Sequence, residues 1–158
     1  MCWECDNPGG DYAAHMLKVI DRFGWGVGGV EASPNDPGWL HTIGLPVTLG
    51  HPELLMQGAT GETHAVLDAI AAYIRDSGRT ISAGETMGLG EHMITFGAVS
   101  RQRRRRGELA SSEEVLARLG FTKVTAIEVL GMPAELQQCS RCFDESLRQW
   151  LSDGPDAA

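Results

Sequence analysis

Four cysteines, arranged in two pairs of identical spacing, constrain this 158-residue chain more than any other feature. The pairs are Cys2-x-x-Cys5 near the start and Cys139-x-x-Cys142 near the end, and the sequence holds no other cysteine. A two-residue gap allows both thiolates of one turn to reach a zinc ion at about 2.3 Å, and two such turns complete its tetrahedral shell. The spacing therefore predicts a structural zinc site of Cys2, Cys5, Cys139 and Cys142 that ties the two ends of the fold together.

Other interpretations of the same cysteines stay open. A redox dithiol usually has its first cysteine after a strand and at a helix N-terminus, which Cys139 partly fits and Cys2 does not. An iron–sulfur cluster also takes four cysteines, although nothing in the spacing favours it. Thiols with no ligand at all are the simplest alternative. A four-thiolate zinc site would support folding rather than catalysis, because it leaves no open coordination position.

The length fits one domain, and we expect a single domain over residues 1–154 followed by a disordered tail at 155–158. No apolar run approaches the roughly 20 residues that span a bilayer. The N-terminus also lacks the basic start and apolar stretch of a signal peptide. These features predict a cytoplasmic protein that does not contact membranes.

The pattern of apolar and turn-forming residues predicts mixed helices and strands. Helices are expected at residues 11–23, 62–77 and 111–119, and from Pro133 onward. Strands are expected at residues 25–30, 39–45, 53–57, 93–99 and 122–130. Because strands and helices do not alternate regularly, the prediction is an α+β fold with an antiparallel or mixed sheet covered by helices.

Four polar residues lie at the ends of two predicted neighbouring strands: His41, Thr42, His51 and Glu53. Imidazole, hydroxyl and carboxylate groups that converge on one sheet edge can perform acid–base chemistry. These residues therefore form the candidate catalytic site of a small hydrolase or transferase. Alternatively, Thr42 is only a good strand former and Glu53 only bonds a neighbouring turn.

Five of the 13 basic residues are concentrated in one short segment, at Arg101, Arg103, Arg104, Arg105 and Arg106. The rest of the chain is strongly acidic, since 21 acidic residues face the remaining basic ones. An acidic body repels a phosphate backbone, so nucleic acid can bind only through this segment. No aromatic residue interleaves the arginines to stack on bases. An acidic protein partner or self-association with the acidic body is equally compatible, as is a solvated loop.

The segments Trp39–Leu45, with its Thr-Ile-Gly-Leu, and His51-Pro52-Glu53-Leu54 resemble a bacterial family known as domain of unknown function 4262. The likeness covers about Met1–Val99, includes the Cys-x-x-Cys start and implies no activity. A fainter likeness to suppressor-of-fused domains rests on a Gly-Leu segment before a Glu-Leu strand, followed by a helix and a turn at Ser82–Glu85. That likeness implies an α+β module that binds other proteins and has no catalytic centre.

Taken together, the sequence favours a non-enzymatic cytoplasmic binding module with a structural zinc site. The expected partner is a protein, or else a nucleic acid held by the arginine segment. The alternatives are the hydrolase or transferase built around His41, Thr42, His51 and Glu53, and a Cys-x-x-Cys redox or redox-sensing protein.

Overall fold

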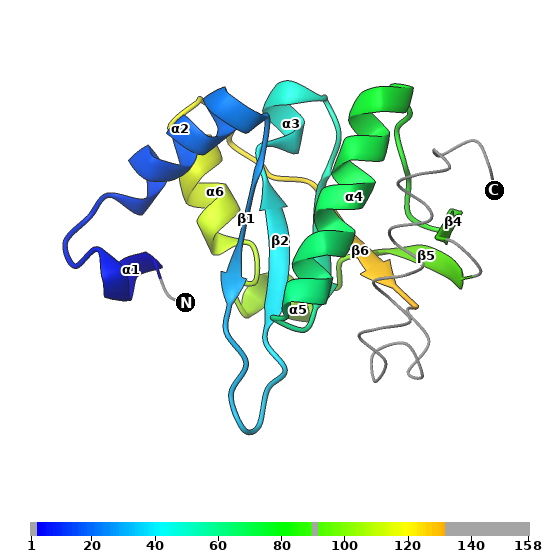
Figure 1. The fold of residues 1–158 in the computed structure, drawn as a ribbon, viewed down its shortest axis with the longest axis horizontal. Helices are drawn as coiled ribbons and strands as arrows, with labels where there is room; N and C mark the ends of the chain where they lie inside the picture. The colour runs from blue at the N-terminus through cyan, green and yellow to red at the C-terminus, as the bar shows by residue number, and fades with distance from the viewer. Residues whose placement is uncertain (1–2, 90–91, 132–158) are drawn as a thin grey trace.

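A computed structural model describes residues 3–89 and 92–131, which form one α+β domain built on a mixed sheet (Figure 1). The strands are β1 (Gly26–Val30), β2 (Trp39–Ile43), β3 (Glu53–Gln57), β4 (Thr86–Leu89), β5 (His92–Ala98) and β6 (Ala126–Leu130). The helices are α1 (Trp3–Asp6), α2 (Tyr12–Phe23), α3 (Leu45–Thr48), α4 (Gly61–Ser77), α5 (Arg101–Arg105) and α6 (Ala110–Ala117). The α+β prediction with a mixed sheet is confirmed.

The last strand of the chain lies inside the sheet rather than at its edge. The strand order is β1-β2-β3-β6-β5-β4, so β6 separates β3 from β5. The β6 strand pairs in parallel with β3, in the register Leu54↔Ile127, and antiparallel with β5, in the register Phe96↔Val129. All other neighbouring strands are antiparallel.

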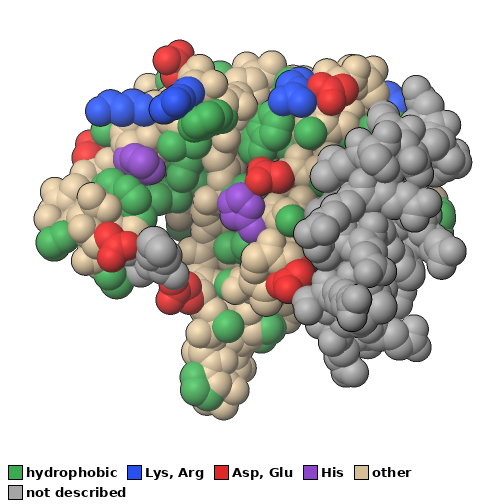
Figure 2. Space-filling model, in the orientation of Figure 1, with side chains coloured by type: hydrophobic (Ala, Val, Ile, Leu, Met, Phe, Trp, Pro, Cys, Tyr) green, Lys and Arg blue, Asp and Glu red, His purple; other side chains and the backbone are tan. Residues whose placement is uncertain are grey.

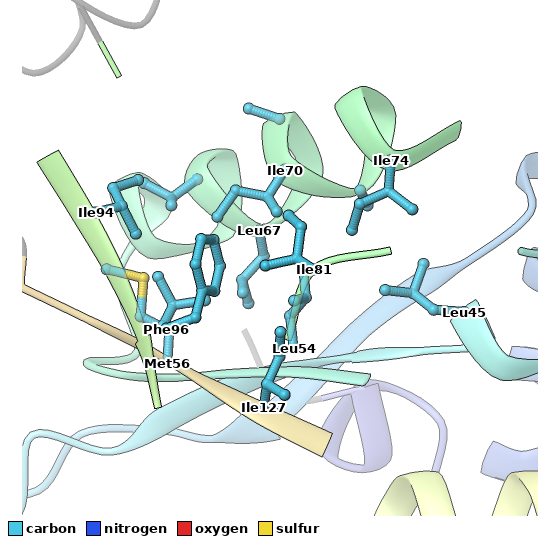
Figure 3. Packing of buried hydrophobic residues seen from close by; sticks show 14 residues of the cluster. Leu45, Leu54, Met56, Leu67, Ile70, Ile74, Ile81, Ile94, Phe96 and Ile127 are labelled. Atoms are coloured by element: carbon cyan, nitrogen blue, oxygen red, sulfur yellow. The ribbon is translucent and has the colours of Figure 1, made fainter. Parts of the chain in front are cut away.

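Helices cover the sheet on both faces. On one face α4 packs against β3, β5 and β6, and Figure 3 shows its side chains Leu67, Ile70 and Ile74 pointing toward the sheet. On the other face α2 and α6 form a smaller cluster around Ile43 of β2. Each fully buried Leu or Ile contributes about 1.5–3 kcal/mol, so the α4 layer is the main source of stability.

The ends of the two long helices follow from local chemistry. The Asp11 carboxylate accepts a hydrogen bond from the Ala14 N–H at 3.0 Å and caps α2, which ends at Gly24 with φ 92°. The Thr60 hydroxyl caps α4, which ends at Gly78 with φ 67°. The predicted helices at 11–23 and 62–77 are confirmed, and so is the strand at 53–57.

Other local predictions differ from the structure. The elements α3, β4 and α5 occupy segments that the sequence pattern leaves as loops or turns. The helix predicted at 111–119 is shifted toward the N-terminus, because α6 runs over Ala110–Ala117 with Leu109 as its N-cap. The strand predicted from 122 begins only at Ala126. The helix expected from Pro133 and the tail at 155–158 lie outside the described residues.

Within the described ranges, no helix combines the length and the apolar character that crossing a bilayer requires.

Candidate functional site

The carboxylate of Glu53 is the centre of a buried polar cluster at the start of β3. Its side chain has no solvent exposure, and four groups donate hydrogen bonds to it. The donors are the Thr42 hydroxyl at 2.6 Å, the Gly44 N–H at 2.6 Å, the Ser112 hydroxyl at 3.2 Å and the Leu45 N–H at 3.4 Å. Glu53 thereby joins the end of β2, the start of α3 and the first turn of α6.

Local conformation positions these donors. Gly44 has φ 120°, a value that favours glycine, and a Cβ atom there would lie 2.8 Å from Ile20 Cγ1. This turn directs the Gly44 and Leu45 N–H groups toward Glu53. The Thr42 hydroxyl accepts the Leu54 N–H at 2.8 Å, which leaves its own proton to donate to the carboxylate.

Burial sets the protonation of Glu53. Loss of hydration raises the pKa of this carboxyl to about 7, while the hydrogen bonds from Thr42, Gly44 and Ser112 partly oppose the rise. The group therefore changes charge near neutral pH. All of its described hydrogen-bond partners are internal, so the cluster links segments of the fold.

The two candidate histidines contact backbone groups instead. The His41 ring is buried, and its Nδ1 donates to the Thr42 carbonyl at 3.0 Å. Burial lowers the pKa of His41 to about 4, so this ring is neutral at pH 7. His51 donates from Nδ1 to the Pro52 carbonyl at 2.7 Å and accepts the Ile81 N–H at Nε2, 2.9 Å away. Burial also lowers the pKa of His51.

Of the four candidate residues, the structure therefore brings one pair into direct contact, Thr42 with Glu53, and the catalytic role stays a prediction. Within the described part of the chain, neither imidazole is hydrogen-bonded to that carboxylate. Burial of all four side chains separates them from solvent and from any reactant dissolved in it. Sequence reasoning missed Ser112, which lies 59 positions from Glu53 and gives no local signal.

The arginine segment forms the short helix α5 and the turn after it. The Ser100 hydroxyl caps the helix by accepting the Arg103 N–H at 3.2 Å. Arg103 then places one guanidinium between two carboxylates, 2.7 Å from Glu108 Oε2 and 2.8 Å from Glu128 Oε1. Both carboxylates are buried. Burial is the largest cause that raises the pKa of Glu128, whereas Arg103 lowers it.

Two further arginines attach this segment to the rest of the fold. Arg106 Nη2 lies 2.7 Å from Asp36 Oδ2 in the connection between β1 and β2, and its guanidinium lies over the Trp39 ring at 5.7 Å. The Trp39 Nε1–H donates to the Glu108 carbonyl at 3.1 Å. Arg104 donates to the Val124 carbonyl at 3.1 Å. Arg103, Arg104 and Arg106 thus attach the segment to other parts of the fold, although Arg104 and Arg106 are themselves exposed.

The remaining two arginines, Arg101 and Arg105, are exposed. Their spacing of four residues puts them on the same side of α5. Among the residues that the structure describes, neither forms an ion pair. The segment therefore divides by its contacts into three arginines that bind other parts of the fold and two whose guanidinium groups form no ion pair within the described residues.

A second polar group on the surface of α4 was not anticipated. His64 Nδ1 lies 3.1 Å from Asp68 Oδ2, and Trp25 Nε1–H donates to Asp68 Oδ1 at 3.0 Å. Figure 2 shows histidine and acidic side chains side by side on this face. The hydrogen bond that the His64 ring donates to the Asp68 carboxylate raises the pKa of His64. The four-residue spacing of His64 and Asp68 is a signal that the sequence offers, whereas the role of Trp25 depends on tertiary contact.

The cysteine prediction lies mostly outside the described residues. Cys2, Cys139 and Cys142 are among the residues not described, and Cys5 is exposed in α1. Near it, the Trp3 ring stacks on His15 at 5.1 Å and meets Tyr12 edge to face at 5.5 Å. In residues 3–89 and 92–131, no three His, Cys, Asp or Glu side chains are grouped to hold a metal. The zinc site stays a prediction.

Comparison with known proteins gives one match. The family model for a domain of unknown function, DUF4262, matches residues 19–118, which is more than half of the chain. No curated protein and no solved structure matches. The match includes α5 and the C-terminal part of α2 but not the Cys2-x-x-Cys5 start. The likeness to suppressor-of-fused domains stays a prediction. The chain therefore belongs to the DUF4262 family.

Proposed function

We propose that this protein is a binding module that holds an acidic segment of a partner protein on the exposed side of α5. The observation that carries the proposal is the division of the arginine segment. Three arginines are used to fix α5 on the domain, and Arg101 and Arg105 face solvent. The cytoplasm is the proposed compartment.

The anchoring contacts make the two exposed arginines a prepared site. Two like charges four residues apart on a helix repel each other and destabilise it by about 0.2–0.5 kcal/mol. The folded protein tolerates this small loss of stability. The cap at Ser100 and the bridge from Arg103 to Glu108 hold the helix in place before any partner arrives. A partner therefore loses less free energy in ordering the site.

Charge distribution supports an acidic partner at this position. The chain has a net charge of −8 although five arginines lie in one segment, so the remaining surface repels acidic molecules. Such a charge pattern directs an acidic segment of a partner toward α5 and disfavours its binding to the acidic remainder of the surface. Nucleic acid shares the negative charge, but α5 offers no aromatic side chain between its arginines for base stacking.

The buried cluster supports a binding module rather than the alternative hydrolase or transferase. An acid–base residue must reach the substrate through a hydrogen bond or one water molecule. His41, Thr42 and Glu53 are buried and bonded to groups of the chain itself. The cluster is better suited to holding β2, β3 and α6 together.

The structural zinc site of Cys2, Cys5, Cys139 and Cys142 remains part of the proposal. The reducing cytoplasm keeps such thiols available for metal. We expect one zinc ion per chain in protein purified without added metal, and loss of that zinc in Cys5→Ser. Metal-free wild-type protein, or full zinc content in the variant, would contradict this part of the proposal.

The arginine site is tested by charge reversal. Binding of a fluorescent poly-glutamate peptide is measured by anisotropy for the wild type and for the double variant Arg101→Glu, Arg105→Glu. The matched control is Lys18→Glu with Arg22→Glu, two exposed residues of α2 that give the same change in net charge. We expect affinity to fall roughly tenfold or more in the α5 variant and to change little in the control.

Three outcomes would overturn the proposal. The wild type does not bind the peptide, both double variants lose affinity equally, or single-stranded DNA of the same charge binds more tightly than the peptide. The last outcome would make nucleic acid the partner.

A further inference from the structure

We infer that the contact between His51 and Ile81 is a pH-sensitive switch, which holds the connection between α4 and β4 on the domain while the imidazole is neutral and releases it when the imidazole is protonated. The connection covers residues 78–85 and runs from the end of α4 to β4 in Figure 1. The Nε2 atom of His51 accepts a hydrogen bond from the Ile81 N–H at 2.9 Å, across 30 positions of the chain. This bond joins the connection to the segment that leads into β3.

The connection has one buried residue. Residues 75–80 and 82–86 are exposed, whereas Ile81 between them is buried. Figure 3 shows the Ile81 side chain inside the main core cluster, near Leu54 and Leu67. A buried backbone N–H without an acceptor is unfavourable, so the position of Ile81 depends on the acceptor that His51 supplies.

The His51 ring can accept this hydrogen bond in one protonation state only. Its Nδ1 donates to the Pro52 carbonyl at 2.7 Å, so the neutral ring carries its proton on Nδ1 and a lone pair on Nε2. A proton taken up from solvent must bind at Nε2, and that new N–H then faces the Ile81 N–H. Because two donors cannot bond each other, the charged ring and the connection must separate.

The charges around His51 determine where the switch operates. Burial lowers the pKa of His51 below its ordinary value of 6.5, while the Pro52 carbonyl and the Glu85 carboxylate partly oppose this effect. Glu53, two positions along the chain, directs its carboxylate to other donors, and Arg79 of the connection donates to a hydroxyl of α4. The contact therefore stabilises the fold fully above about pH 6.5, and this contribution is lost as pH falls.

Other contacts limit the released part to the middle of the connection. At one end the Gly78 N–H donates to the Ile74 carbonyl at 2.9 Å. At the other end the Gly84 N–H donates to the Phe96 carbonyl of β5 at 2.7 Å. These bonds involve no titratable group, so protonation of His51 frees residues 79–83 and leaves the sheet paired.

The switch goes beyond the proposed binding at α5 and does not rest on it. Arg101 and Arg105 stay charged throughout the acidic range, because the pKa of an arginine lies far above it. Failure of acidic peptides to bind α5 would leave the switch unaffected, and a pH-independent connection would leave the α5 proposal unaffected.

The test is an NMR titration of the full chain from about pH 7.5 to about pH 4.5, a range that spans histidine protonation. The ¹⁵N shifts of the His51 ring report its charge, and hydrogen exchange, corrected for the intrinsic effect of pH, reports the protection of the Ile81 amide. We expect this protection to fall about tenfold or more, with the midpoint of the ring titration. The amides of β3 should keep their protection.

Three variants identify the group responsible. His51→Gln offers an amide oxygen that can accept the Ile81 N–H and does not titrate, so the protection should no longer depend on pH. The matched control, His64→Gln on the surface of α4, should keep the transition. Glu85→Gln removes a charge that favours the protonated ring and should move the midpoint to lower pH.

Several results would overturn the inference. The Ile81 amide keeps its protection while the His51 ring titrates, or the ring stays neutral down to about pH 4.5. A transition that persists in His51→Gln would assign it to another group, such as the carboxyl of Glu53. If His51→Gln does not fold, a difference between the ring and amide midpoints in the wild type would still contradict the switch.

Discussion

The cluster around Glu53 and the arginine segment at α5 are both rich in polar groups, yet the fold uses them differently. Glu53 directs its carboxylate inward, where four donors of the chain surround it. The α5 segment uses part of its charge in the same way, through Arg103, and leaves Arg101 and Arg105 to solvent. Residue type alone therefore does not separate a polar group that holds the fold together from one that is left to solvent. The contacts that each side chain makes within the fold separate them.

The largest effect is expected at the buried cluster. Replacement Glu53→Ala removes one acceptor and leaves four buried donors, including the Gly44 N–H and the Ser112 hydroxyl, without a partner. We expect the free energy of unfolding to fall by about 4 kcal/mol, measured by urea denaturation. Glu53→Gln keeps the shape and should lose less. A loss below about 1 kcal/mol in Glu53→Ala would show that the cluster is not structural.

A smaller effect on the free energy of unfolding is expected in the arginine segment, where Arg103 and Arg101 should differ. Arg103→Ala leaves the carboxylates of Glu108 and Glu128 buried without their cation, so we expect a loss of about 3 kcal/mol in unfolding free energy. Arg101→Ala removes an exposed side chain and should not change stability measurably. Equal losses in both variants, recorded in the same denaturation series, would remove the distinction between anchoring and exposed arginines.

The smallest effect concerns pH. Because the pKa of Glu53 is raised to about 7 from 4.5, the folded state holds a proton that the unfolded state releases between these values. Its contribution to stability is complete below about pH 4.5 and is lost as pH rises through 7. His41 acts in the opposite direction, since its pKa is lowered to about 4 and its contribution is lost as pH falls from 6.5.

The two contributions oppose each other in the wild type, and Glu53→Gln removes one of them. We expect the stability of the wild type relative to Glu53→Gln to fall by about 2 kcal/mol between pH 4.5 and pH 7, measured by denaturation at each pH. Glu62→Gln, at an exposed carboxylate, controls for loss of a charge. A constant difference across this range would mean that Glu53 does not titrate there.

Elements with strong local signals were predictable from the sequence. The α2 and α4 helices have apolar periodicity, a polar N-cap and a terminal glycine, and these signals act within a few residues. In contrast, α3, β4 and α5 are short, and their positions depend on contacts such as those of Arg103 with Glu128. Propensity over five residues is too weak to specify such elements.

The candidate site was predictable only in part. Thr42 and Glu53 lie on adjacent strands, and the sequence pattern anticipated their contact. Their burial depends on α6, whose Ser112 is distant in sequence. The arginines form one run in the sequence, and only the positions of Glu108, Asp36 and Val124 distinguish anchors from exposed groups.

The central position of β6 has a consequence for biosynthesis. Since β6 joins β3 to β5, the two parts of the sheet, β1-β2-β3 and β5-β4, are not joined directly to each other. A growing chain must therefore release Ala126–Leu130 from the ribosome before its halves can combine. Until then the inner edges of β3 and β5 are exposed to other chains, and a truncation before Ala126 would leave them so permanently.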